Sequence, residues 1–176
     1  MTDDWPDPRF RELTPALLAS LAADEVADAV VQHVALQVDI VGEENRAAIV
    51  SGLPAGTSAV YTTWLVDIEV NNGGFNQFFF NPYGQFAGLA LAGYELLGAE
   101  DYAAVMRSAI ATHEAERQTI APYYEEATLE SFSESYQHTE LAEVDQRYYA
   151  LGDRIYSVWA DFVRLRPESF APKGTR

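Results

Sequence analysis

The chain has 176 residues, a length that suits one folded domain with its own hydrophobic core. Its residues are 48% hydrophobic and 12% aromatic, which is too apolar for a disordered chain. The sequence contains 27 Asp and Glu residues and 11 Lys and Arg residues, so the formal net charge is -16. Direct binding of nucleic acids or anionic membranes is therefore not expected. The absence of cysteine excludes disulfides, thiol nucleophiles and thiolate metal sites.

The N-terminal sequence does not have the pattern of an export signal. Asp3, Asp4 and Asp7 lie where a secretory signal would carry positive charge before an apolar core. No apolar run approaches the roughly 20 residues of a membrane-spanning helix. We therefore expect a cytoplasmic protein that forms a single domain over residues 1–176, with short tails at about 1–12 and 167–176.

Helical patterns begin near the N-terminus. Thr14 followed by Pro15 is a helix start, since the hydroxyl can cap the helix and the proline needs no amide partner. A stripe of valines at every fourth residue predicts a long helix that Gly42 ends: Val26, Val30, Val34 and Val38.

Further helices follow along the chain. Val60, Trp64 and Ile68 share a helix face that ends at residues 71–74, and 81–84 resembles a type I turn. Residues 85–97, 100–113 and 141–166 continue the helical pattern, and no strand alternation appears. The sequence predicts an all-α fold, a single compact domain of about five to seven helices.

An amide- and glycine-rich run separates two of these helices. It comprises Asn71, Asn72, Gly73, Gly74, Phe75, Asn76, Gln77 and Phe78. Its amides and glycines could form an anion-binding nest. Because no Lys or Arg accompanies it, a structural corner is favoured, in which Gly73 adopts a left-handed conformation and the phenylalanines enter the core.

Enzyme signatures are missing from the sequence. His33, His113 and His138 are isolated, and no zinc helix, nucleophile elbow or nucleotide-binding loop is present. We expect His113 to lie exposed at a helix end. The sequence predicts no catalytic residue, metal site or cofactor.

The acidic residues are unevenly spread, which gives the clearest indication of function. Residues 118–146 contain no basic residue but hold seven acids: Glu125, Glu126, Glu130, Glu134, Glu140, Glu143 and Asp145. A second basic-free stretch, residues 12–45, includes Asp24, Glu25 and Asp28. We predict that these ten residues bind a basic partner.

A helix through Glu126, Glu130 and Glu134 would align like charges, which cost a few tenths of a kcal/mol per pair. Its opposite face would bury three apolar or aromatic side chains: Leu129, Phe132 and Tyr136. Stability alone does not favour such a surface. A general acidic bias, as in salt-adapted proteomes, is the alternative explanation.

The run from Val70 to Asn81, together with residues 96–100 and 141–170, resembles a bacterial family of DNA mimics. This resemblance implies an all-helical, dimeric protein whose acidic face imitates duplex phosphates. That face is expected to occupy the DNA-binding surface of a helix-turn-helix transcription regulator. We therefore expect an acidic homodimer that sequesters a basic DNA-binding protein. The alternatives are a neutralising partner of a basic toxin or nuclease, and a small-ligand-binding domain.

Overall fold

The computed structural model describes residues 5–171, and every regular element in this range is helical. The all-α prediction is therefore confirmed. The described residues form nine α-helices, more than the five to seven predicted. Short helices such as α3 (Arg46–Gly52) and α7 (Leu129–Ser135) have too few turns to produce a recognisable hydrophobic period. Within this range, no helix combines the length and apolarity needed to span a membrane.

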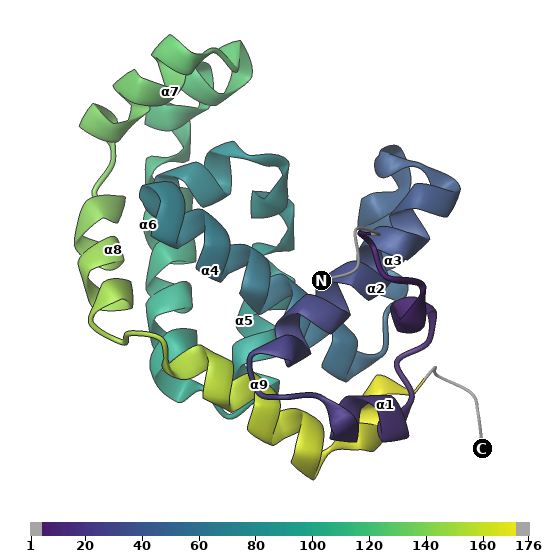
Figure 1. Ribbon diagram of the computed structural model, residues 1–176. Coiled ribbons are helices and arrows are strands. Elements are labelled where there is room, and N and C mark those ends of the chain that lie inside the picture. Colours follow the sequence, from purple (N-terminus) through teal and green to yellow (C-terminus); the bar gives the residue numbers. More distant parts are fainter. Residues whose placement is uncertain (1–4, 172–176) are drawn as a thin grey trace. The chain divides into compact units, whose positions relative to one another are not determined.

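The chain divides into two compact units, one formed by residues 1–61 with 154–176 and the other by residues 62–153. The described part of the first unit contains α1 (Pro15–Ser20), α2 (Glu25–Val41), α3, the start of α4 (Ala55–Phe80) and α9 (Arg154–Leu165) (Figure 1). Three short 3-10 helices accompany them: η1 (Pro8–Arg11), η2 (Glu43–Asn45) and η5 (Pro167–Phe170).

Two helix boundaries in this unit follow the predicted capping chemistry. The Thr14 hydroxyl accepts a hydrogen bond from the Leu17 N–H at 3.2 Å and begins α1. Gly42, with φ at 94°, ends α2. Both boundaries agree with the sequence prediction.

The predicted tails are wrong where the structure describes them. Phe10 and Phe170 are 4% and 2% exposed, so both belong to the core of the first unit. A Cβ atom on Gly56 would lie 2.8 Å from the Phe170 ring, which shows how closely η5 packs on the start of α4. Residues 1–4 and 172–176 of the predicted tails lie outside the described range.

The second unit contains the rest of α4, followed by η3 (Pro82–Phe86), α5 (Ala87–Leu96), α6 (Glu100–Glu126), α7, η4 (Tyr136–His138) and α8 (Leu141–Tyr149). Helix α6 packs against α5, α7 and α8 (Figure 1). It runs 13 residues beyond the predicted end at residue 113. Pro122 lies inside it, and its later turns are largely exposed, so the apolar stripe fades there.

The helical course of α4 breaks at two glycines. Gly73 has φ -154° and ψ 27°, whereas Gly74 has φ 72° and ψ -179°. The predicted interruption is therefore present, but Gly74 and not Gly73 has the positive φ. The Gly74 conformation is one that essentially only glycine adopts. A Cβ atom there would also lie 2.3 Å from Oδ2 of Asp145, so two independent constraints require glycine.

The backbone groups freed by this break find partners far away in the sequence. The Phe75 N–H donates to Oδ1 of Asp145 at 2.7 Å. The hydroxyls of Tyr149 and Tyr136 donate to the carbonyls of Val70 and Gly73 at 2.9 and 2.5 Å. Side chains from α8 and η4 thus cap both sides of the break, a role that helix ends usually fill locally.

We predict that Gly74→Ala lowers the free energy of unfolding by about 1–3 kcal/mol or more, because it forces a side chain into a glycine-only conformation. The matched control is Gly88→Ala in α5, where an added Cβ meets no atom within 4 Å. That control should raise stability by about 0.5–1 kcal/mol. Urea denaturation of both variants measures the two effects, and equal stabilities would contradict the geometry at Gly74.

Candidate partner-binding surface

Six of the predicted binding residues lie exposed along the end of α6, α7 and the start of α8. They are Glu125, Glu126, Glu130, Glu134, Glu140 and Glu143. Helix α7 follows the end of α6, and α8 returns beside α6 (Figure 1). The structure therefore gathers these six carboxylates on consecutive elements of one unit, and residues 125–143 are called the acidic segment below.

None of these six carboxylates forms an ion pair or a side-chain hydrogen bond within residues 5–171. Elsewhere in the described chain, exposed acids do pair. Glu95, for example, contacts Arg107 at 2.7 Å. The segment thus presents negative charge that no described side chain neutralises.

The positions of several of these acids oppose helix stability. Glu125 and Glu126 occupy the last turn of α6, and Glu134 the last turn of α7. A carboxylate at a helix C-terminus faces the negative end of the macrodipole, with an effect of about 0.3–1 kcal/mol at exposed sites. Helix stability therefore does not explain these residues.

Asp145 is a correction to the predicted binding set, because it is only 8% exposed. Its carboxylate faces Gly74 and accepts the Phe75 N–H. Burial raises the pKa of Asp145, and the hydrogen bond from Phe75 partly offsets this rise. Asp145 is a structural carboxylate and not part of the exposed acidic surface.

The predicted single helix through Glu126, Glu130 and Glu134 is also wrong. Ala127 has φ 51° and ends α6, and Thr128 begins α7 through a capping box with Ser131. The first of the three glutamates therefore lies on α6 and the other two on α7. The break changes the expected inner face as well, since Leu129 is 84% and Tyr136 38% exposed. Phe132 is half-buried and packs against Phe80 at 4.8 Å.

The three predicted acids of the first unit have local roles. Asp24, Glu25 and Asp28 surround the start of α2, where negative charge stabilises a helix. Glu25 accepts the Ala22 N–H at 2.8 Å, and Asp28 accepts the Gln32 amide at 2.7 Å. Because a favourable place at the helix start or a local hydrogen bond accounts for each of them, these residues are weaker binding candidates than Glu125, Glu126 and Glu134.

Glu116, which no sequence pattern singled out, anchors the acidic segment. Its carboxylate accepts the Glu140 N–H at 2.8 Å and the Thr139 hydroxyl at 2.5 Å. These contacts join α6 to the start of α8. Their separation of 23 and 24 residues leaves no local signal in the sequence.

The amide-rich corner of α4 contacts the acidic segment near the ends of α6 and α7. Asn76 is 1% exposed, donates to the Ser135 hydroxyl at 2.8 Å and accepts the Tyr124 hydroxyl at 2.9 Å. It therefore joins α4 to both α6 and α7. Phe75 and Phe78 are fully buried, as expected for a structural corner.

His113 does not lie exposed at a helix end as expected. It is half-buried within α6, and its ring stacks on Phe79 with centroids 4.1 Å apart. Burial, with a smaller contribution from the Arg117 charge, lowers the pKa of His113. The neutral ring thus acts as an aromatic packing group.

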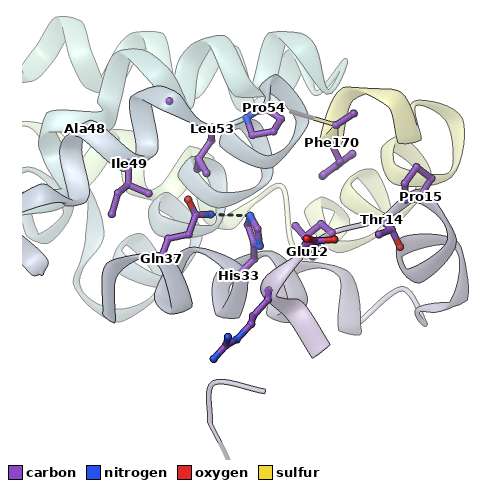
Figure 2. A pocket seen from close by; sticks show the side chains of 14 residues that line it. Glu12, Thr14, Pro15, His33, Gln37, Ala48, Ile49, Leu53, Pro54 and Phe170 are labelled. Carbon is purple, nitrogen blue, oxygen red and sulfur yellow. Dashed lines mark hydrogen bonds between the residues drawn. The ribbon is translucent and has the colours of Figure 1, made fainter. Parts of the chain in front are cut away.

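The first unit has a pocket of its own, of about 800 Å³. Figure 2 shows His33 and Gln37 of α2 side by side in it, with Leu53 and Phe170 on its other walls. Nδ1 of His33 donates to the Phe10 carbonyl, and Nε2 accepts the Gln37 amide, each at 2.8 Å. Both ring nitrogens are engaged, so His33 offers a ligand no free nitrogen in this arrangement.

A family model described as DMP19-like protein matches residues 51–166. The match includes the Asn71–Phe78 corner and all six exposed glutamates, and it excludes the acids around the start of α2. Comparison with curated proteins and with solved structures gave no match.

We predict that Asp145→Asn is at least as stable as the wild type at pH 7, because its side-chain oxygen can still accept the Phe75 N–H without a buried charge. Since burial raises the folded-state pKa above the ordinary value of 3.8, the protonated carboxyl stabilises the fold at low pH. That stability is lost as the pH rises through the folded-state pKa.

The free energy of unfolding of Asp145→Asn, relative to that of the wild type, should therefore increase between pH 4 and pH 7, as measured by urea denaturation. Asp145→Ala is the control and should lose about 1–3 kcal/mol, because it leaves the Phe75 N–H without an acceptor. An Asn variant that loses stability relative to the wild type as the pH rises would show that the charge itself is favourable.

Proposed function

Because the chain belongs to the DMP19-like family, a family of DNA mimics, we propose that it sequesters a basic DNA-binding protein such as a helix-turn-helix transcription regulator. The observation that carries this proposal is the set of six exposed glutamates on α6, α7 and the start of α8, none of which forms an ion pair with a described residue. The proposed role is binding and not catalysis, without a cofactor.

Charge complementarity supports this role. A protein that binds duplex phosphates presents Arg and Lys side chains, and an unpaired carboxylate surface attracts the same groups. Such a surface increases the association rate and selects basic partners, and both effects weaken with salt. The glutamates that oppose the α6 and α7 dipoles fit a surface whose role is recognition.

The test begins with capture of a partner from lysate of the native host, followed by competition with duplex DNA. We predict that duplex DNA displaces the captured protein. Changing Glu126, Glu130 and Glu134 together to Gln should weaken its binding about tenfold, or about 1.4 kcal/mol. The salt dependence of the affinity should also flatten, because fewer charges cross the interface.

The matched control changes three exposed glutamates outside the segment to Gln: Glu100, Glu114 and Glu168. It alters the net charge equally, so a general acidic bias predicts equal losses of affinity in both triple variants. The proposal predicts a clearly larger loss for the first variant. A partner that binds the protein and duplex DNA simultaneously would contradict mimicry.

We further propose that the protein acts as a homodimer. Duplex DNA carries one charge per about 3.4 Å along each strand. Glutamates at i and i+4 on a helix are about 6 Å apart along its axis, and α7 supplies only Glu130 and Glu134 in such a row. Several helices, or two copies of the chain, are needed to approach the phosphate density.

Sedimentation equilibrium at physiological salt should therefore give about twice the 19.5 kDa of one chain. Raising the salt concentration should strengthen self-association, because it screens repulsion between two strongly acidic subunits. A monomer at every protein and salt concentration would contradict the two-subunit form of the proposal while leaving the binding test unaffected.

A further inference from the structure

A cavity of about 390 Å³ lies between the amide-rich end of α4 and the α6–α7 turn, within the second unit. One wall comes from α4 and the residue that follows it, through Gln77, Phe80 and Asn81. The other wall includes Thr128 and Leu129. The cavity thus lies between the amide-rich corner and the acidic segment.

The amide groups in this cavity have a fixed direction. Nε2 of Gln77 and Nδ2 of Asn81 both donate to Oε2 of Glu69, at 2.8 and 2.7 Å. Glu69 is only 7% exposed and lies behind the two amides. Each amide therefore turns its nitrogen towards Glu69 and its carbonyl oxygen away. The Gln77 oxygen lies against Gly73, since a Cβ atom there would be only 2.2 Å from it. No described residue donates to the Asn81 oxygen, which remains available as an acceptor.

The remaining walls suit a flat, positively charged group. Phe80 and Phe132 lie 4.8 Å apart between ring centroids and provide aromatic surface. Among residues 5–171, no Lys or Arg lines the cavity. Glu126 and Glu130 directly flank its Ala127–Leu129 wall in the chain, and both are exposed and form no ion pair with a residue of the described range.

We propose that this cavity holds an arginine side chain of the basic partner. Arginine combines a permanent charge with a planar donor array that can bond to amide oxygens and stack on aromatic rings. Lysine offers a compact ammonium that stacks less well. An anion is disfavoured, because the amide nitrogens face Glu69 and glutamates flank the wall. The inference rests on the proposed function and names the contact that would anchor the partner.

The exposed Leu129 strengthens the argument. It is 84% exposed although it lines the cavity, and Glu130 follows it directly in the chain. Anchor positions at protein interfaces are desolvated by surrounding apolar contacts. Leu129 can cover the aliphatic part of an inserted arginine, and this contact would remove the leucine from water.

The direct test is an NMR titration with Nα-acetyl-arginine amide and with the corresponding lysine compound. The side-chain amide signals of Asn72, Gln77 and Asn81 report on the cavity. The arginine compound should shift these signals saturably. The lysine compound should bind more weakly, by at least about fivefold. Equal shifts with both compounds, or none with arginine, would overturn the proposal.

The matched variants are Asn72→Lys and Gln118→Lys. Asn72 lines the cavity, is exposed and makes no side-chain hydrogen bond with a described residue, so a lysine there adds a repelling charge without removing a structural contact. Gln118 is exposed on α6 outside the cavity, and its lysine variant changes the net charge equally. Only Asn72→Lys should abolish binding of the arginine compound.

Titration of the captured partner separates the two proposals. If Asn72→Lys weakens the complex much more than Gln118→Lys does, the cavity is an anchor. If both variants bind equally while the Glu126, Glu130 and Glu134 triple change weakens the complex, the arginine pocket is wrong and the acidic surface stands. If the triple change also has no specific effect, the proposed function itself fails.

Discussion

The contact between Asp145 and the α4 break is the interaction on which the second unit depends. Gly74 has no Cβ atom, so the carboxylate approaches the backbone and accepts the Phe75 N–H at 2.7 Å. An acceptor is well placed there, because this N–H begins the helical segment that follows the break. Tyr149 and Tyr136 complete the cap on the preceding carbonyls. The hydrogen bonds of the corner are therefore complete only when α8 and η4 are in place.

This dependence connects the buried motif with the exposed charges. Asn76 ties the corner to Tyr124 near the end of α6 and to Ser135 at the end of α7, and Glu116 fixes the start of α8. The same elements carry the six exposed glutamates. The amide-rich corner can thus specify how an acidic surface is arranged without contributing a charge to it.

Local chemistry made part of this structure predictable from sequence. The Thr14 cap, the end of α2 at Gly42 and the interruption at residues 71–74 were found because each depends on neighbours within a few residues. The role of Asp145 was missed, because its partner lies 70 residues away and a basic-free run makes all its acids look alike. The end of α6 at Ala127 was also missed, because alanine usually favours continuation of a helix.

Formal charge alone therefore does not define the candidate surface. The chain contains 27 acidic residues, and their contacts distinguish acids with a structural role from acids that are exposed without a partner among the described residues. Asp145 and Glu69 satisfy backbone and amide donors in the interior, and Glu25 and Asp28 accept hydrogen bonds at the start of α2. The six glutamates of α6, α7 and α8 satisfy no described group, and three of them oppose a helix dipole. Glu130, Glu140 and Glu143 lie at the starts of α7 and α8, where negative charge is favourable. Neither hydrogen bonding nor helix stability accounts for Glu125, Glu126 and Glu134, and these three glutamates give the proposed recognition of a basic partner its strongest support.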